Sequence, residues 1–119
     1  MSAPTKKRQS RKALTPIARR IGQLRQQLGL SQRDLGLAIG LDEMVAAIRI
    51  NQYEHGVHTP IFSLVQKLAA VANIPVAFFY TDDDELAGLL SHFGHLGPVA
   101  RSKLIQFAAE LAQGPERDI

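Results

Sequence analysis

The 119-residue chain has no cysteine and no tryptophan, and aromatic residues make up only 6% of it. Without cysteine, a disulfide framework, thiolate ligation of zinc and a cysteine nucleophile are all excluded. No apolar run approaches the roughly 18 residues of a membrane span or provides the core of a signal peptide. The sequence therefore predicts a cytoplasmic chain with no membrane contact.

The net charge is only +3, but it is unevenly distributed along the chain. Residues 1–60 contain ten Lys and Arg against four Asp and Glu, whereas residues 61–119 contain four against seven. A basic half beside an acidic half indicates that the first half meets a polyanion and that the second has another role. The hydrophobic content of 45% is enough to bury the core of one domain.

The two ends of the chain lack the periodicity of the rest. Residues 1–14 combine Ser, Thr, Gln, Lys and Arg, and such a segment buries too little apolar surface to offset its ordering entropy. We therefore predict a disordered basic arm over residues 1–14. Residues 114–119 begin with Gly114-Pro115, which ends the last helical pattern, and are predicted to form a flexible tail.

The rest of the chain has apolar residues at three- and four-residue steps, which is typical of helices, and shows no strand signal. The first helix is predicted between Thr15-Pro16, a capping signal, and Gly29, a stop signal. Ser31 is predicted to cap a short second helix from Gln32 to about Ile39. These two helices make up the start of the domain predicted over residues 15–80.

Three further helical segments complete that domain. Asp42 is predicted to cap a third helix that ends near Gly56. Thr59-Pro60 repeats the capping signal and is predicted to open a fourth helix, which the residues at 73–75 break. One more helical turn is predicted over Val76–Tyr80. The fold class is therefore predicted to be all-α.

Residues 81–113 predict two more helices, whose apolar stripes exceed what five small helices need to close a core. We predict that this C-terminal helical extension holds two copies of the chain together as a homodimer. The alternative is that both helices fold back onto their own domain. The candidate dimerisation residues are Leu86, Leu89, Leu90, Phe93, Leu104, Phe107 and Leu111.

A set of capping, small and apolar residues between positions 21 and 69 carries a family resemblance: Ile21, Leu24, Arg25, Gly29-Leu30-Ser31-Gln32, Leu35, Ala38, Gly40, Ile50, Tyr53-Glu54, Gly56, Pro60, Leu64 and Lys67-Leu68-Ala69. In this order and spacing they resemble the phage repressor/Cro (XRE) family of helix-turn-helix proteins. Within this set, the small or apolar residues Ala38, Gly40 and Ile50 let two short helices cross steeply, so that the second can enter a major groove.

The resemblance implies a lambda-repressor-like five-helix DNA-binding domain, followed here by the two-helix C-terminal extension. It also implies a sequence-specific transcriptional regulator that binds double-stranded DNA, acts as a repressor and is not an enzyme. In the family, an arginine and a glutamate at the positions of Arg25 and Glu54 form an ion pair between the first helix and the end of the recognition helix. The resemblance therefore implies a structural Arg25–Glu54 pair, with a phosphate contact as the alternative role of Arg25.

The chain departs from the family pattern between Gly40 and Glu54, where fourteen positions replace roughly ten. The additional residues, about four, correspond to roughly one helical turn, so the faces of the helix would rotate by only about 40° if the helix were longer. We predict an extended recognition helix over about 42–54. A longer turn, with the helix starting near Val45, is the alternative.

The positions that read bases in the family fall on Ala47, Ile48, Arg49 and Gln52, with Asn51 on an adjacent face. Arg49 suits a bidentate contact to guanine, and Gln52 or Asn51 suits adenine. Ala47 suits the methyl group of thymine. We interpret Ile48 as a residue of the core.

The candidates for phosphate contacts lie around this helix. Gln32 begins the second helix, where free backbone N–H groups and the helix dipole attract an anion. Arg33, His58 and Arg19 or Arg20 are further candidates because of their charge or polarity. The basic arm is a candidate for the DNA backbone or the minor groove, an interpretation that rests on charge alone.

Two histidine pairs, His55 with His58 and His92 with His95, are three residues apart but lack a cysteine or a nearby carboxylate that would complete a metal site. We predict no metal, no cofactor and no catalytic residues. The alternative from another functional class is a protein-interaction module, such as an antitoxin whose acidic C-terminal half binds a protein partner.

Overall fold

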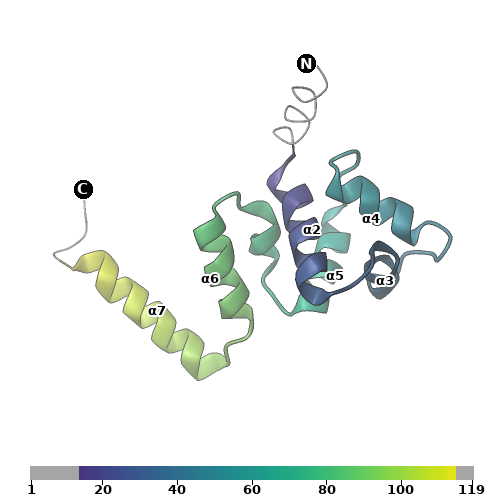
Figure 1. Ribbon diagram of the computed structural model, residues 1–119. Coiled ribbons are helices and arrows are strands. Elements are labelled where there is room, and N and C mark those ends of the chain that lie inside the picture. The colour runs from purple at the N-terminus through teal and green to yellow at the C-terminus, as the bar shows by residue number, and fades with distance from the viewer. Residues whose placement is uncertain (1–13, 115–119) are drawn as a thin grey trace, which may run out of the picture.

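The computed structural model describes residues 14–114, which form a series of helices without a strand (Figure 1). The all-α fold class is therefore confirmed. The predicted arm, apart from Leu14, and the predicted tail, apart from Gly114, lie outside the described residues. In chain order the elements are α2 (Pro16–Leu28), α3 (Gln32–Ala38), α4 (Ala46–Glu54), α5 (Phe62–Ala72), the 3-10 helix η1 (Val76–Tyr80), α6 (Asp84–Gly94) and α7 (Pro98–Gln113).

The first two helices begin where the sequence predicts, because local capping groups are in place. The Thr15 hydroxyl accepts a hydrogen bond from the Ala18 N–H at 3.4 Å, and the Ser31 hydroxyl accepts one from the Asp34 N–H at 3.0 Å. Gly29 ends α2 with φ of 70°, a left-handed conformation that favours glycine. Capping chemistry that is readable in the sequence thus sets the boundary between α2 and α3.

The helix α4 begins at Ala46, so the extended recognition helix predicted over about 42–54 is wrong. The extra residues lengthen the turn between α3 and α4, as in the alternative interpretation. Val45 precedes the helix without a side-chain cap, and its N–H donates to the Asp42 carbonyl at 3.0 Å. Tertiary packing accompanies this start: a Cβ on Gly36 would lie 2.7 Å from the Cβ of Ala46, so the first residue of α4 packs closely against α3. The residues before Ala46 form the turn between the two helices.

The helix α5 begins at Phe62 and not at Thr59-Pro60, so this capping prediction is also wrong. Ile61 occupies the N-cap position without a side-chain hydrogen bond, and Pro60 is buried. The proline therefore packs into the interior instead of forming the first helical turn. The predicted turn over 76–80 is present as η1.

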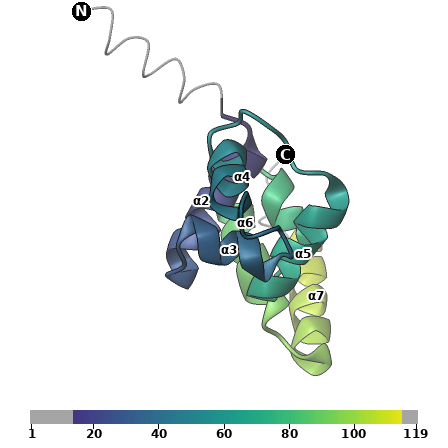
Figure 2. The same ribbon diagram turned by 90° about the vertical axis from the view of Figure 1, so that its right-hand side faces the viewer.

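The core lies among α2, α3, α4 and α5 (Figure 2), and η1 and α6 close the side of it that leads to α7 (Figure 1). The rings of Phe78 and Phe79 meet edge to face with their centroids 5.2 Å apart. The larger residues of the buried cluster are Ile17, Ile21, Leu24, Leu35, Ile39, Ile50, Tyr53, Val65, Leu68, Ile74, Phe78 and Phe79. Because α4 contributes to this cluster, its orientation is fixed by the core.

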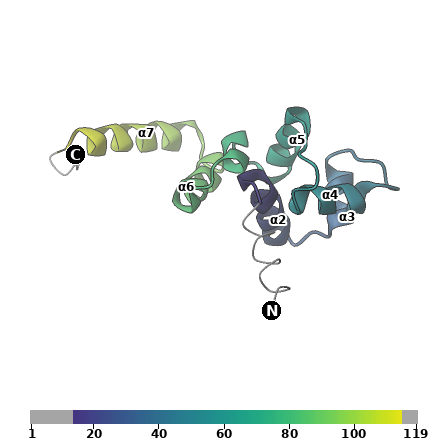
Figure 3. The same cartoon turned by 90° about the horizontal axis from the view of Figure 1, so that it is seen from above.

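The two C-terminal helices differ in how they relate to this body. In α6, Ala87 is buried, and a Cβ on Gly94 would lie 2.7 Å from the Cα of Ile74. In α7, by contrast, no residue is buried, and the helix projects away from the body (Figures 1 and 3). Folding back onto the domain therefore describes α6 but not α7. No helix within residues 14–114 is long and apolar enough to cross a membrane.

Candidate nucleic-acid interface

The helix α4 has one apolar face directed into the core and one largely polar face directed outward. Ala46, Ile50 and Tyr53 are buried, and their spacing of four and three residues places them on one side of the helix. Asn51, which is exposed, and Gln52, which is half-buried, lie on the opposite side. The core thus holds α4 while leaving amide side chains available to a ligand.

Ile48 lies at the centre of the outward face and is 59% exposed, so its interpretation as a core residue is wrong. Since α4 starts at Ala46, Ile48 is two residues and about 200° away from the first buried position. The sequence held a signal for this placement, namely the i, i+4, i+7 spacing of Ala46, Ile50 and Tyr53. That spacing leaves Ile48 outside the core face.

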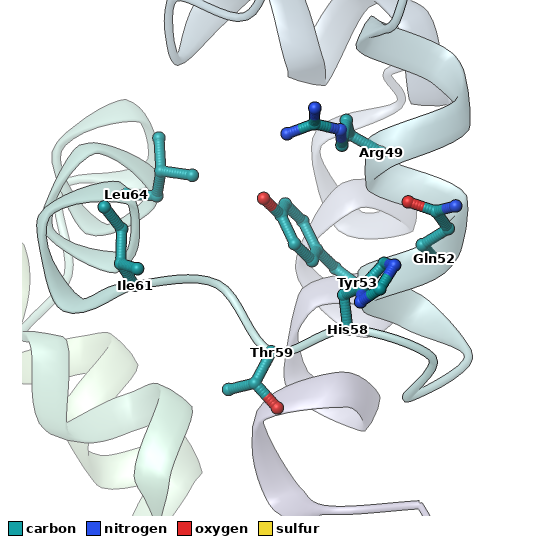
Figure 4. Close-up of a pocket in the computed structure, with 7 residues that line it drawn as sticks. All are labelled: Arg49, Gln52, Tyr53, His58, Thr59, Ile61 and Leu64. Atoms are coloured by element: carbon teal, nitrogen blue, oxygen red, sulfur yellow. The ribbon is translucent and has the colours of Figure 1, made fainter.

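A cleft of about 520 Å³ lies between α4 and the loop that leads into α5 (Figure 4). Arg49 and Gln52 line it from α4, and His58 lines it from the loop. In Figure 4 the guanidinium of Arg49 points from α4 toward α5. The cleft therefore brings two predicted base-reading residues and one predicted phosphate-binding residue onto one concave surface. Thr59 and Ile61 also line this cleft, and neither was predicted from the sequence to be a site residue.

The other two predicted base-reading residues, Ala47 and Asn51, are not among the residues that line the cleft. Ala47 is half-buried and Asn51 is exposed. The backbone carbonyl of Asn51 lies 2.8 Å from Nδ1 of His55, so the first of the two histidine pairs has one ring nitrogen engaged at the end of α4. The structure thus divides the predicted base-reading set between the cleft and the opposite edge of the helix.

Arg25 and Glu54 are brought together, as the family resemblance implies. Nε of Arg25 donates to Oε2 of Glu54, and Nη2 donates to Oε1 at 3.3 Å. The side chains are only 19% and 9% exposed, respectively. Nη1 of Arg25 also donates to the Leu30 carbonyl at 3.1 Å. This network ties the end of α4 to α2 and to the turn before α3.

The hydrogen bond from Arg25 to Glu54 raises the pKa of the Arg25 guanidinium above its ordinary value. Partial burial acts in the opposite direction, and the charge of Glu54 adds to the upward shift. The guanidinium therefore stays charged, and its positive charge offsets that of the shielded Glu54 carboxylate at the end of α4.

Two of the predicted phosphate-binding residues already have partners within the protein. Nε2 of Gln32 donates to Oε1 of Glu54 at 3.2 Å, so Gln32 extends the network at the start of α3. Nη2 of Arg33 lies 2.7 Å from Oε2 of Glu43, in the lengthened turn, and both side chains are more than half exposed. A phosphate contact by either residue stays a prediction.

Arg19 and Arg20 face the start of α6 and not the cleft. Nη1 of Arg19 lies 3.7 Å from Oδ1 of Asp84, and Nη1 of Arg20 lies 3.0 Å from the same atom. Arg20 is only 1% exposed, and its Nε donates to the Thr81 carbonyl at 3.0 Å. This internal role of Arg20 was not predictable from the sequence, because an arginine in a basic region is distinguished there only by its charge.

Within residues 14–114, no group of three or more histidine, aspartate or glutamate side chains is placed to hold a metal ion. In the second histidine pair, Nδ1 of His95 lies 2.9 Å from the Ser91 carbonyl, so this ring also has a backbone contact.

Comparison with known proteins supports a family assignment for this arrangement. The sequence pattern of the helix-turn-helix family matches residues 21–79. The crystal structure of the transcriptional regulator BswR superposes with a TM-score of 0.73 at 36% sequence identity, and the match covers 82% of this chain and 98% of that one.

Two curated relatives are also similar to the chain, and both carry the description of HTH-type transcriptional regulators. They come from Sinorhizobium medicae (strain WSM419) and Rhizobium meliloti (strain 1021). Each is 33% identical over 66 residues, which make up 56% of this chain and 45% of the relative, so the match spans less than half of either relative. The helical order, the placement of α3 and α4 and these matches together show that the chain belongs to the XRE-like family of helix-turn-helix proteins.

Proposed function

We propose that this protein is a cytoplasmic DNA-binding transcriptional regulator and not an enzyme. In this proposal it reads duplex DNA through the outward face of α4 and represses transcription. The observation that carries the proposal is the division of α4 into two faces. Ile50 and Tyr53 fix the helix in the core, and the pair of Arg25 and Glu54 fixes its end. A recognition helix held in this way can present side chains to base edges without reorganising.

In this proposal the polar side chains of α4 read the major groove. Arg49 donates to N7 and O6 of guanine, and Gln52 or Asn51 pairs with N6 and N7 of adenine. Ala47 touches a thymine methyl group. Each well-formed bidentate contact would discriminate against the wrong base by about 1–3 kcal/mol.

Phosphate contacts position the protein on the duplex in this proposal. His58 lies in the loop that lines the cleft beside Arg49, so it would meet the backbone next to the groove. Gln32 stands at the start of α3, where backbone N–H groups favour an anion. Arg33 would reach a phosphate by leaving Glu43, an exchange between exposed groups of low cost. Arg19 retains part of its exposure and would contribute charge at longer range.

Base reading is tested by fluorescence anisotropy on promoter fragments at two salt concentrations. The wild type is expected to prefer one fragment over bulk DNA by about a thousandfold or more. Arg49→Ala should lose about 5- to 150-fold on that fragment and little on bulk DNA, with a nearly unchanged salt slope. Lys103→Ala, which removes the same charge from α7, is the matched control. An Arg49→Ala protein as selective as the wild type would refute this assignment.

We also propose that the C-terminal helices hold two copies together. Leu86 and Leu89 on α6 are exposed, as are Phe107 and Leu111 on α7. Leu104 shares a helical face with Phe107 and Leu111 because of its spacing. A two-fold association through these faces would give the assembly two copies of α4, and the paired recognition helices of such dimers enter successive major grooves about 34 Å apart.

The remaining predicted dimerisation residues, Leu90 and Phe93, are half-buried. Leu90 packs against the core of its own chain, and the ring of Phe93 lies under Arg101. In the proposed dimer, Leu90 and Phe93 pack within their own chain, and the exposed residues make the contact between the two copies.

Self-association is tested by sedimentation equilibrium over a range of protein concentrations. The wild type is expected to sediment as a dimer, and Phe107→Glu should shift it toward the monomer because a charge would be buried in the interface. Ser102→Glu places the same charge on the other side of α7 and should leave the dimer intact. A monomeric wild type would contradict the dimer.

A monomeric wild type would also favour the second candidate function, a protein-interaction module in which α7 binds a different protein. The observation behind this candidate is that α7 buries none of its own residues. A contiguous apolar face of this kind marks an interaction site. Co-purification of a stoichiometric partner that Phe107→Glu abolishes, together with a monomeric protein on its own, would favour this candidate over the homodimer.

A further inference from the structure

A groove of about 440 Å³ lies where the end of α5, the segment that leads into η1 and the junction between α6 and α7 meet. Most of the residues that line it are apolar: Ala69, Ala70, Ile74, Pro75, Val76 and Phe93. Ala70 is exposed, and Phe93 is half-buried. None of the residues proposed to contact DNA lines this groove, so base reading does not account for it.

The groove is continuous with the exposed side of α6. Phe93, whose ring lies under Arg101, forms the wall of the groove on this side. It follows Leu89 by four residues and Leu86 by seven, so the three side chains share one stripe of the helix. Leu86 and Leu89 are exposed residues of the proposed dimer contact. The groove therefore adjoins the apolar surface of the proposed homodimer.

The chain's own α7 starts at the edge of this groove and leaves it. Arg101, in the first turns of α7, holds the helix to the end of α6, because its Nε donates to the Phe93 carbonyl at 3.2 Å and its Nη2 to the Gly94 carbonyl at 3.4 Å. Beyond this point α7 projects away from the body (Figure 3), and Leu111 lies about 15 Å further along the helix. The apolar stripe of α7 therefore stays outside the groove of its own chain.

The charges of the groove and of α7 are complementary between two copies. Arg101 is the one charged residue among those that line the groove, and its Nη1 has no hydrogen-bond partner within residues 14–114. Glu110 is the only charged residue from position 104 to position 113. Its Oε2 accepts a hydrogen bond from Nε2 of Gln106 at 3.0 Å, which leaves Oε1 to accept another.

This complementarity selects a direction. When two α7 helices lie antiparallel, the tip of each lies at the base of the other, so Glu110 of each copy meets Arg101 of its partner. When they lie parallel, each residue meets its own equivalent, and the carboxylates face one another instead. A two-fold axis perpendicular to α7 gives the antiparallel arrangement and repeats every contact twice.

We propose that the groove is the docking site for α7 of a second copy, which lays its stripe of Leu104, Phe107 and Leu111 into it. The second copy receives α7 of the first in return, with the two helices antiparallel. This inference rests on the proposed homodimer and adds the place and the direction of the contact. An amphipathic helix in an apolar groove is a common mode of protein association, and here the reciprocal exchange closes the assembly at two copies.

The place of docking is tested by sedimentation equilibrium of the full-length variant Ala70→Glu. Because Ala70 is exposed, the variant should keep the circular dichroism spectrum of the wild type. Its dimer dissociation constant should rise about tenfold or more, because α7 of the second copy would bury the new carboxylate. The matched control is Ser63→Glu, which puts the same charge at an exposed position of α5 outside the groove and should sediment like the wild type.

The direction of docking is tested by cross-linking, which is specific because the chain has no cysteine of its own. Copies with Ala70→Cys are mixed with tagged copies that carry Leu111→Cys and are treated with a short bis-maleimide reagent. The mixed pair should cross-link. Leu111→Cys alone should not, because antiparallel helices keep their two tips apart, and Ser63→Cys in place of Ala70→Cys should not either.

Three results would overturn the inference in distinguishable ways. A dimeric wild type that Ala70→Glu leaves intact and whose mixed pair does not cross-link overturns docking in the groove, while the homodimer stands. Leu111→Cys that cross-links to itself shows parallel helices and overturns the direction. A monomeric wild type overturns the homodimer and this inference together, and a stoichiometric partner that Ala70→Glu then releases would assign the groove to a different protein.

Discussion

Residues 16–94 and residues 98–113 of the same chain use apolar side chains in opposite ways. Each helix from α2 to α6 buries at least one residue, whereas α7 buries none. The link between the two parts includes Arg101, whose Nε donates to the Phe93 carbonyl at 3.2 Å and whose guanidinium lies over the Phe93 ring at 4.6 Å. Apolar periodicity alone therefore does not tell a helix that packs into the body from one that stands outside it.

The helix α6 belongs to the body because it is held at both ends. At its start, the buried guanidinium of Arg20 lies 3.0 Å from Asp84 and 5.6 Å from the centroid of the Phe78 ring. At its end, Gly94 packs closely against the backbone at Asn73 and Ile74. Because α6 is fixed to the body at both ends, the point where α7 begins is also fixed relative to the body.

The largest expected difference between the two parts comes from removing a ring. Phe79→Ala should lower the free energy of unfolding by about 3–5 kcal/mol, because Phe79 is fully buried. Phe107→Ala in α7 should leave the body's unfolding midpoint unchanged at low protein concentration. Urea titrations followed by circular dichroism measure both. Equal losses for the two variants would abolish the distinction between the body and α7.

Ion pairs should show a similar contrast within the body itself. Arg25→Met should cost about 3 kcal/mol or more, because it leaves the carboxylate of Glu54 shielded and unpaired. Arg33→Met breaks an exposed pair with Glu43 and should cost less than about 1 kcal/mol. The same urea titrations compare them, and a cost for Arg33→Met as large as that for Arg25→Met would contradict the structural role of the first pair.

Two glycines of α6 should respond to alanine with opposite signs. Gly94→Ala places a Cβ 2.7 Å from the Cα of Ile74 and should cost about 1–3 kcal/mol. Gly88→Ala meets nothing within 4 Å and should stabilise the protein by roughly 0.5–1 kcal/mol through helix propensity. Thermal unfolding of both variants measures the signs. A stable Gly94→Ala protein would mean that α6 is not fixed at this end.

The smallest expected effect concerns pH. The raised pKa of Arg25 in the folded state means that its contribution to stability is complete below its ordinary pKa and is lost only as the pH rises through the raised value. The difference in unfolding free energy between the wild type and Arg25→Met should therefore stay constant from about pH 6 to about pH 9. Urea titrations across this range would contradict the assignment if the difference fell steadily as the pH rose.

Local chemistry made much of the fold predictable from the sequence. Thr15, Ser31 and Gly29 set helix ends through groups within a few residues of themselves. The start of α4 was not predictable in this way, because Asp42 has the appearance of a cap, whereas the helix begins without a side-chain cap at Ala46, where the chain packs closely against Gly36. Errors therefore arose where tertiary packing overrides a local signal.

The candidate site was predictable in its location but not in its detail. The positions of Arg49 and Gln52 on α4 followed from the family resemblance, and the cleft that they share with His58 required the structure. The exposure of Ile48 follows from the spacing of the buried residues Ala46, Ile50 and Tyr53, which places it on the other side of α4. The ion pair between Arg33 and Glu43 could not be predicted, because Glu43 lies in a turn that was predicted to be helical.

We propose that two copies of α4, joined through the C-terminal helices, read one symmetric duplex site. The most direct test is selection of randomised duplex DNA by the full-length protein, followed by sequencing of the bound fraction. We expect an inverted repeat with half-site centres about 10 base pairs or a multiple of that apart, which Phe107→Glu reduces to a single weak half-site. An unenriched pool, or the same repeat selected equally well by Phe107→Glu, would contradict it.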